Sequence, residues 1–300
     1  MRLFHWLRHG LATLGLAALA GGAAAAPAPS AVARPALWRV ADADTTVYLF
    51  GTIHMLPSNF AWRSAALDKA LAKSDGLVVE TKVDESNLRE FHATFSRLGT
   101  RAGLPPILDR VPPDKRAALA TAIATSGRHM AEYDQMESWA AALILVNAQL
   151  KRLGIEGENG VETSLRNAFA RTGKPIGELE SNTDQLGFFD RLSESSQRVL
   201  LEGAIEQPAA MRGQFDAMLK AWTQGDIKAI ARSFNAEMAS SPELRDALLD
   251  RRNANWAGWV ERRMAQPGSV MVAVGAGHLA GEGSVQDMLQ RRGYRVTRLQ

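Results

Sequence analysis

The sequence predicts an α/β fold: one mixed central sheet, built from N- and C-terminal strands, is flanked by helices with long helical insertions. Three observations support this prediction. Short apolar runs of strand length occur at both ends of the chain and once in the middle, and helical periodicity fills the stretches between them. Neither half has enough strands for a sheet of its own, so the strands of both ends must share one.

The first predicted strands belong to an N-terminal unit. Residues 37–40 and 46–50 are apolar runs on either side of Ala-Asp-Ala-Asp, which predicts a hairpin. A helix follows over about residues 64–73, and Ser-Asp-Gly then turns the chain into a short strand over 77–80. Residues 46–80 therefore predict a β-α-β unit, in which both strands end at the same edge of the sheet.

The middle of the chain is mainly helical. Apolar residues three and four positions apart predict helices over 85–98, 112–125, 136–153, 161–171 and, almost without interruption, 182–264. The strand in the middle of the chain, 175–179, precedes Glu180. The C-terminal section predicts a strand, a helix and a strand over residues 269–274, 285–292 and 294–299.

The N-terminus predicts a cleaved export signal. Arg2 and Arg8 give a basic start, residues 11–20 are apolar, and Ala23-Ala24-Ala25 form an A-x-A cleavage box. The apolar run is too short to cross a membrane. We therefore expect cleavage between Ala25 and Ala26 and a periplasmic or secreted protein without a membrane anchor after cleavage.

These features predict the domain organisation: a signal peptide over 1–25, a Pro/Ala-rich linker over 26–36 and a single domain over 37–300. The chain has no cysteine, which excludes disulfides and thiolate chemistry. Its 35 Lys and Arg residues nearly balance 32 Asp and Glu residues without forming a dense basic stripe, so we expect no nucleic-acid partner. A peptide or small-molecule substrate is expected instead, and the oligomeric state is left open.

Two predicted strands end in the same Gly-x-x-His signature. One runs through Gly51 to His54, and the other runs through Gly275 to His278. Glycine permits a sharp exit from the strand and a close approach of backbone to an ion or substrate. Ligand crevices lie at the carboxyl ends of strands in such sheets, so the histidines converge if their strands are neighbours. The alternative is two ordinary strand-to-helix turns.

Carboxylates accompany these histidines at other strand ends. Two histidines with one or two carboxylates are a usual ligand set for Zn²⁺, Mn²⁺ or a similar ion. We predict a divalent metal ion (Mn, Zn or Co) bound by His54, His278 and Glu80. Glu80 and Glu180 are the predicted catalytic carboxylates for attack of a metal-activated water on a carbonyl. Glu162 is another candidate for the general base or for a further ligand, with the alternative that it occupies the first turn of a helix, where an acid favours the helix dipole. Glu80 has the alternative of capping a helix or loop.

A polar cluster on the last long helix predicts substrate contacts. Arg251 and Asn255 are four residues apart and therefore face alike, so this face is a candidate for binding a substrate carboxylate or phosphate. The alternative is a solvated helix face. The chain has no Gly-x-Ser-x-Gly elbow, which, with the absence of cysteine, gives little support to a nucleophilic mechanism.

Motifs in a fixed order along the chain add a family resemblance. They occupy residues 37–40, 48–54, 78–80, 160–162, 177–180, 252–256 and 274–285. In this order they resemble the TraB/GumN family, which is related to the Tiki metalloproteases and pheromone-shutdown proteins. The resemblance covers nearly the whole chain after the leader, with Glu178 as a departure where an apolar residue is commoner. It implies a periplasmic or secreted α/β protein in which His54, His278 and Glu80 bind a divalent metal.

The residues and the resemblance together predict a metal-dependent hydrolase that cleaves a peptide or amide bond in the periplasm. The alternative is a non-catalytic periplasmic binding protein that holds a peptide, a haem-like ligand or a glycan in the same crevice. A third possibility is a structural partner in an envelope assembly. Metal content separates the first hypothesis from the other two, because neither binding nor scaffolding requires a stoichiometric divalent ion.

Overall fold

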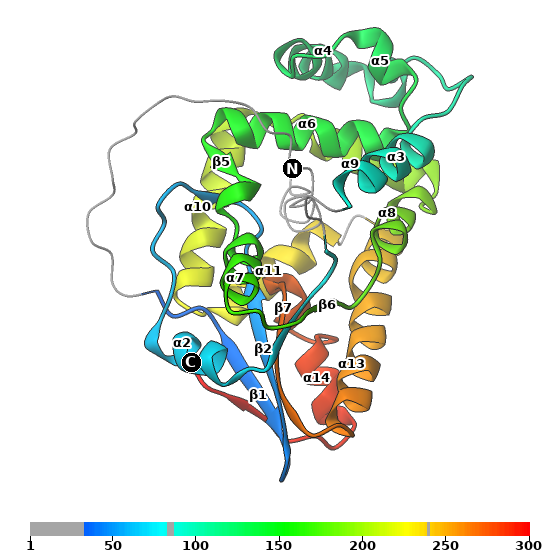
Figure 1. Ribbon diagram of the computed structural model, residues 1–300. Helices are drawn as coiled ribbons and strands as arrows, with labels where there is room; N and C mark the ends of the chain where they lie inside the picture. The colour runs from blue at the N-terminus through cyan, green and yellow to red at the C-terminus, as the bar shows by residue number, and fades with distance from the viewer. Residues whose placement is uncertain (1–32, 83–86, 239–240) are drawn as a thin grey trace.

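The computed structural model describes residues 33–82, 87–238 and 241–300 (Figure 1). The predicted signal peptide over 1–25 and most of the predicted linker over 26–36 lie outside these residues. A six-stranded mixed sheet in the order β6-β4-β7-β2-β1-β8 forms the centre of the protein. Its strands are β1 (Leu37–Ala41), β2 (Thr45–Thr52), β4 (Gly76–Val79), β6 (Ile176–Glu178), β7 (Gly268–Gly275) and β8 (Val296–Arg298).

Helices fill the long stretches between the strands, as the sequence predicted. The first set is α2 (Ala65–Lys73), α3 (Leu88–Gly99), α4 (Arg116–Thr125), α5 (Met130–Asp134), α6 (Ser138–Arg152) and α7 (Val161–Arg171). The second set is α8 (Asn182–Asp190), α9 (Glu194–Gly203), α10 (Pro208–Thr223), α11 (Ile227–Met238), α12 (Pro242–Arg245), α13 (Arg251–Met264) and α14 (Val285–Arg291). None of the helices in the described residues is both long and apolar enough to cross a membrane.

Short elements complete the chain. A small antiparallel sheet pairs β3 (Leu56–Pro57) with β5 (Ile155–Glu156). Single 3-10 turns are η1 (Ile107–Arg110), η2 (Pro113–Lys115), η3 (Gly157–Asn159) and η5 (Ala276–Leu279), and a π turn, η4 (Asp246–Asp250), leads into α13.

Four neighbouring strands of the large sheet, β6, β4, β7 and β2, run parallel. The predicted sharing of one sheet by both chain ends is confirmed, because the C-terminal β7 pairs with the N-terminal β2 from Thr45↔Gly268 to Thr52↔Gly275. The structure adds that β7 lies between the two strands of the predicted β-α-β unit. Since β7 is parallel to both, β2 and β4 still end at the same edge of the sheet.

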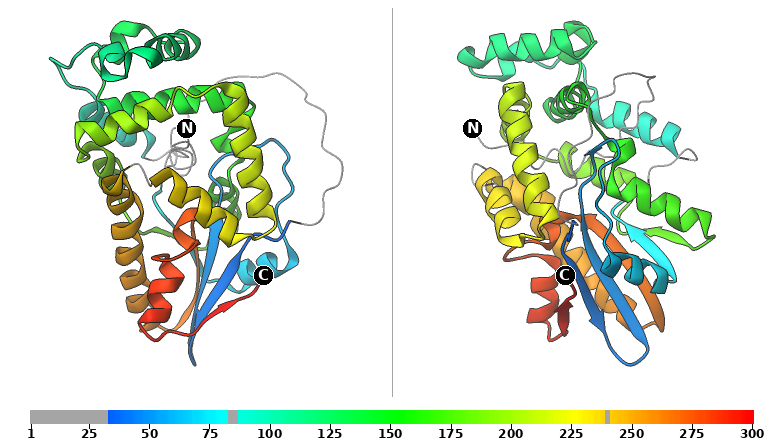
Figure 2. Two further views of the ribbon diagram at one scale, coloured as in Figure 1. Left: turned by 180° about the vertical axis from the view of Figure 1, so that it is seen from behind. Right: turned by 90° about the vertical axis from the view of Figure 1, so that its left-hand side faces the viewer.

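The sheet is buried on both faces. Tyr48 and Phe50 of β2 belong to the core that includes α2, α7 and the inserted helices. Val47 and Leu49, which alternate with them, belong to a second core with α13 and α14. This period of two is the pattern expected for a strand covered on each side. Figures 1 and 2 show the inserted helices standing beyond the carboxyl ends of the strands, where they cover that edge of the sheet.

Candidate functional site

Each of the four parallel strands is followed, just beyond its carboxyl end, by one residue with an ionisable side chain. In sheet order these are Glu180 after β6, Glu80 after β4, His278 after β7 and His54 after β2. Only 5% of His54, 3% of Glu80 and 4% of His278 is exposed, and the Glu180 side chain is also buried. Residues from distant parts of the sequence are therefore brought to one buried cluster.

Glu80 lies at the centre of this cluster. Its Oε1 atom is 3.8 Å from His54 Nε2 and 3.9 Å from His278 Nε2, and it accepts a hydrogen bond of 2.7 Å from the Gly275 backbone N–H. The motif glycines make this approach possible. A Cβ on Gly275 would lie 3.2 Å from the same carboxylate oxygen, and one on Gly51 would lie 3.2 Å from the backbone of the turn after β7.

The other ring nitrogen of each histidine faces an oxygen acceptor. His54 Nδ1 lies 2.5 Å from Glu162 Oε1, and His278 Nδ1 lies 2.7 Å from Asn253 Oδ1. An Nδ1 that donates to such an oxygen leaves Nε2 with a lone pair when the ring is neutral, and this second contact also fixes the ring orientation. In its neutral form, each histidine therefore presents Nε2 as an acceptor on the side of Glu80.

Glu162 occupies the first turn of a helix and also contacts the cluster. It is the second residue of α7, which is the first-turn position predicted for it. Its carboxylate is buried, however, and besides His54 it accepts a hydrogen bond from the Thr52 hydroxyl at the end of β2. Glu162 is thus a positioning residue for His54.

Arg252 joins the remaining members of the cluster. Its Nη2 lies 2.6 Å from Glu80 Oε2, its Nε lies 2.8 Å from Glu180 Oε1, and its Nη1 lies 3.2 Å from His278 Nε2. The guanidinium carbon lies 4.7 Å from the ring centroid of Trp256, which is within cation–π range. Arg252 therefore holds both buried carboxylates in place, with its single positive charge shared between them.

The substrate contacts predicted on α13 lie outside the buried cluster. Arg251 is 71% exposed at its side chain and pairs with Asp246 at 2.5 Å, and Asn255 is also exposed, so the structure does not bring either residue to the cluster. The neighbouring Arg252 and Asn253 occupy it instead. The signal that could have identified Arg252 is its spacing of four residues before the buried Trp256, which places it on the apolar face of the helix.

The environment separates the pKa values of these groups. Burial lowers the pKa of His54, but the charge of Glu162 and its hydrogen bond outweigh burial and raise it. Burial raises the pKa of Glu162, yet the His54 charge leaves it below its usual value. Burial likewise raises the pKa of Glu80, and Arg252 and the two histidines outweigh it, so that the net shift is downward.

Glu180 behaves in the opposite way. Burial raises its pKa, and the opposing charge of Arg252 does not cancel this effect. The negative charge of the neighbouring Glu80, which pairs with the same guanidinium, adds to this rise. The pKa values of these two neighbouring carboxyls are therefore shifted in opposite directions, so Glu180 is the more readily protonated of the two.

The donor set suits a divalent cation in kind and in direction. Two ligands of one tetrahedral ion, each about 2.1 Å from it, lie about 3.4 Å apart. The 3.8 and 3.9 Å separations from Glu80 Oε1 to the two imidazoles are slightly wider than this. Accordingly, among the residues that the structure describes, no group of three or more His, Asp and Glu side chains is close enough to hold an ion as it stands. Arg252 is the competing cation, because it contacts both Glu80 and His278.

Comparison with known proteins identifies the family. A model of the TraB/PrgY/gumN family matches residues 36–298. The uncharacterized protein YbaP of Escherichia coli (strain K12) is 26% identical over 243 residues, which cover 81% of this chain and 87% of YbaP. YbaP of Shigella flexneri is 27% identical with the same coverage. No solved structure matches. Because the family match spans most of the chain, the protein belongs to the TraB/PrgY/gumN family, as the order of motifs predicted.

Proposed function

We propose that this family member is a metal-dependent hydrolase that cleaves a peptide or amide bond in the periplasm, with a divalent ion (Mn, Zn or Co) bound by His54, His278 and Glu80. The observation that carries the proposal is the orientation of the two imidazoles. Each Nδ1 contacts an oxygen of Glu162 or Asn253, while each Nε2 lies within 4 Å of the same Glu80 oxygen. Metal-binding histidines in proteins are oriented through such outer contacts.

Residues of the protein itself would orient the ligands and accept the proton. A divalent ion bound here would supply Lewis acidity and lower the pKa of a water molecule. Glu162 and Asn253 hold the imidazoles in the tautomer that binds cations through Nε2. Glu180, whose pKa burial raises, is the carboxyl suited to accept a proton from the attacking water. Arg252 fixes Glu80 and Glu180 relative to each other through one guanidinium.

The choice of a peptide or amide bond is supported by the resemblance to the Tiki metalloproteases and by no contact in the cluster itself. The predicted export signal supports the periplasmic location. The proposed substrate is therefore a peptide or a small amide that reaches the envelope.

One observation favours a second candidate function, a periplasmic binding protein without turnover. Arg252 already balances the charge of Glu80, and His54 balances that of Glu162, so the cluster is electrostatically satisfied without an ion. A structural cluster of this kind would shape a crevice for a peptide, a haem-like ligand or a glycan without any metal.

Elemental analysis distinguishes the two functions. Wild type purified after export, without chelator, is expected to carry about one divalent ion per chain, and His54→Ala and His278→Ala are expected to lose it. The matched control is His92→Ala, because His92 lies half-buried on α3 and is absent from the cluster. Glu80→Gln keeps the size of the side chain but removes its charge, so we expect weaker metal binding.

Activity completes the test. Each protein is incubated with a peptide library and added Mn²⁺, Co²⁺ or Zn²⁺ in turn, and cleavage is followed by mass spectrometry. Loss of cleavage in both histidine variants, with retention in His92→Ala, supports the hydrolase. Full activity in His278→Ala, or a wild type that binds no divalent ion, overturns it, and ligand binding that survives chelation then identifies the binding protein.

A further inference from the structure

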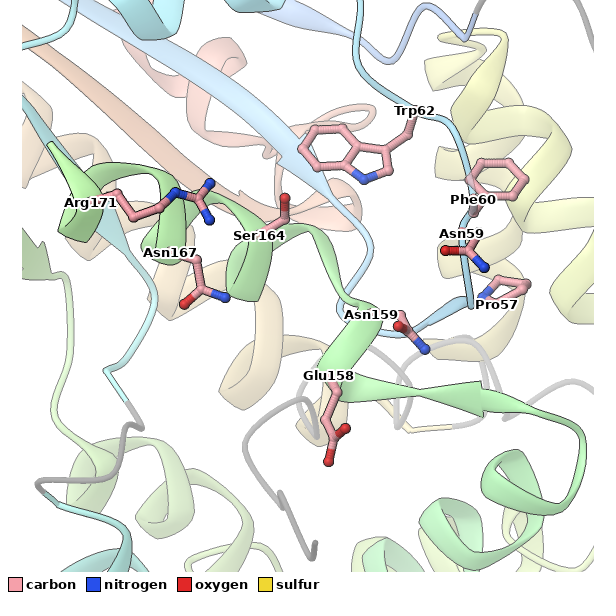
Figure 3. A pocket seen from close by; sticks show the side chains of 9 residues that line it. All are labelled: Pro57, Asn59, Phe60, Trp62, Glu158, Asn159, Ser164, Asn167 and Arg171. Carbon is pink, nitrogen blue, oxygen red and sulfur yellow. The ribbon is translucent and has the colours of Figure 1, made fainter. Parts of the chain in front are cut away.

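A polar cavity lies outside the histidine cluster, on the other side of the first turn of α7. Its volume is about 290 Å³, and it opens between the loop that follows β3, the η3 turn and the outer face of α7 (Figure 3). Ser164, Asn167 and Arg171 share that outer face of the helix, because they follow one another at spacings of three and four residues. The loop contributes Asn59 and the aromatic residue Trp62 on the facing wall.

The polar lining has no internal use. Six polar side chains border the cavity, and the part of the chain that the structure describes gives none of them a hydrogen-bond or salt-bridge partner: Asn59, Glu158, Asn159, Ser164, Asn167 and Arg171. Most of these side chains are exposed to solvent, so those that face the cavity can contact a ligand without breaking a contact within the protein. Asn59 also has a left-handed backbone, with φ of 59°, at the rim of the cavity. Non-glycine residues in this region are uncommon and often mark functional positions.

The chemistry of the lining selects a class of ligand. The charges of Glu158 and Arg171 cancel, so the cavity offers no net attraction to an anion or a cation. Three amides and a hydroxyl both donate and accept hydrogen bonds, which matches a ligand rich in hydroxyl groups. Most of the lining is polar, unlike the mainly apolar pockets that bind drug-like molecules.

The aromatic wall adds an apolar surface of limited size. Trp62 is buried, and its ring stacks on that of Phe50 with the ring centroids 6.2 Å apart, so its position in the wall is fixed. Figure 3 shows its indole nitrogen pointing into the cavity and Phe60 standing beside it. The ring edge that carries the indole N–H, rather than a ring face, therefore borders the cavity, where it can donate a hydrogen bond to a sugar hydroxyl.

We propose that this cavity binds a saccharide of one or two units. The site is separate from the histidine cluster, because the backbone just after β2, at Ile53 and His54, packs against the start of α7 between them. Gly160 shows how tight this wall is, since a Cβ there would lie 1.9 Å from the His54 carbonyl oxygen. The proposal therefore does not depend on metal binding or on hydrolysis.

An array of neutral mono- to tetrasaccharides, probed with the labelled full-length mature protein, tests the proposal. The best saccharide is then titrated by calorimetry against wild type, Asn167→Ala and Arg171→Ala. Each substitution is expected to weaken binding about tenfold, the usual effect of losing one or two hydrogen bonds. Arg97→Ala is the matched control, because Arg97 is exposed on α3 and does not line the cavity. Unchanged thermal melting and metal content of the cavity variants separate a lost ligand contact from lost folding and from the proposed metal site.

Tri-alanine and tri-glycine are titrated in parallel as peptide probes. Saccharide binding that falls in both cavity variants but not in Arg97→Ala supports the proposal. Peptide binding without saccharide binding overturns it in favour of a peptide site. Absence of binding to every saccharide on the array, or binding that neither cavity variant weakens, also overturns it.

Discussion

Replacing Glu162 by glutamine tests how His54 is held in its orientation. In the native protein Glu162 Oε1 lies 2.5 Å from His54 Nδ1, and the Thr52 hydroxyl donates to the same carboxylate. The substitution keeps the size and shape of the side chain but removes its negative charge. His54 then loses the partner whose charge outweighs the effect of burial, so its pKa is expected to fall.

The size of the effect follows from the burial of the pair. A hydrogen bond to a charged group contributes about 1.5–3 kcal/mol to stability, and breaking a buried ion pair costs about 3–5 kcal/mol when one charge is left unpaired. Glutamine can still accept a hydrogen bond from His54, and a neutral His54 leaves no unpaired charge. We therefore expect Glu162→Gln to lower the free energy of unfolding of the metal-free protein by about 2 kcal/mol.

The loss should depend on pH in a defined window. The pKa of His54 is raised above 6.5 in the folded protein, so its contribution is complete below pH 6.5 and disappears as pH rises through the folded pKa. The pKa of Glu162 is lowered from 4.5, so its contribution is present above pH 4.5 and disappears as pH falls through the folded pKa. The full difference between wild type and variant is expected between these values, at about pH 5.5, and a smaller one at pH 9.

Urea unfolding followed by tryptophan fluorescence, with a chelator present at both pH values, measures this difference. Glu282→Gln is the control, because the Glu282 side chain is 85% exposed and its surface ion pair is expected to contribute about 0–1 kcal/mol at either pH. Equal losses for Glu162→Gln at pH 5.5 and pH 9, or no loss at pH 5.5, would show that the carboxylate does not hold a charged His54.

Three further predictions follow from the same site and from the leader. Arg252→Met should destabilise the metal-free protein by about 3–5 kcal/mol because it leaves buried carboxylates unpaired. Calorimetry should also show that adding Mn²⁺ or Zn²⁺ raises the melting temperature of this variant more than that of wild type. An equal rise would contradict the idea that Arg252 competes with the divalent ion. Gly275→Ala should lower the free energy of unfolding by about 1–3 kcal/mol and weaken metal binding, since its Cβ would lie 3.2 Å from Glu80. In the same denaturation assay the control Gly213→Ala should not lower it, because a Cβ there would have nothing within 4 Å. Mass spectrometry of the exported protein should find an N-terminus at Ala26, and retention of Met1 in a cytoplasmic pool would contradict the predicted export.

The sequence predicted the fold well because its main signals are local. Strand-length apolar runs and helical periodicity mark elements wherever they occur, and the need to complete a sheet joined the two ends of the chain. The order of strands is a different kind of information. The insertion of β7 between β2 and β4 depends on which edges meet during folding, and no pattern within residues 46–80 or 268–275 specifies it.

The candidate site was predictable to the same extent. Strand ends supplied His54, His278, Glu80 and Glu180, because a residue just beyond a parallel strand has a known place at the edge of the sheet. The site residues on helices were harder to predict. The polar side chains of α13 suggested an outward pair, but the direction of a helix face is set by what packs against it, and the apolar stripe with Trp256 carries Arg252 inward.

The central strand of the sheet is also the last long strand to be synthesised. β7 pairs with both β2 and β4. Until residues 268–275 leave the ribosome, β2 and β4 therefore cannot become part of one sheet. Contacts of such large sequence separation slow folding, because a long loop must close before they form. Assembly of the histidine cluster therefore coincides with completion of the whole chain, and a fragment that ends after α13 is expected to have helices but no site. For a protein predicted to pass through a membrane before it folds, this order keeps the nascent chain incomplete, and so unfolded at its centre, for most of its synthesis.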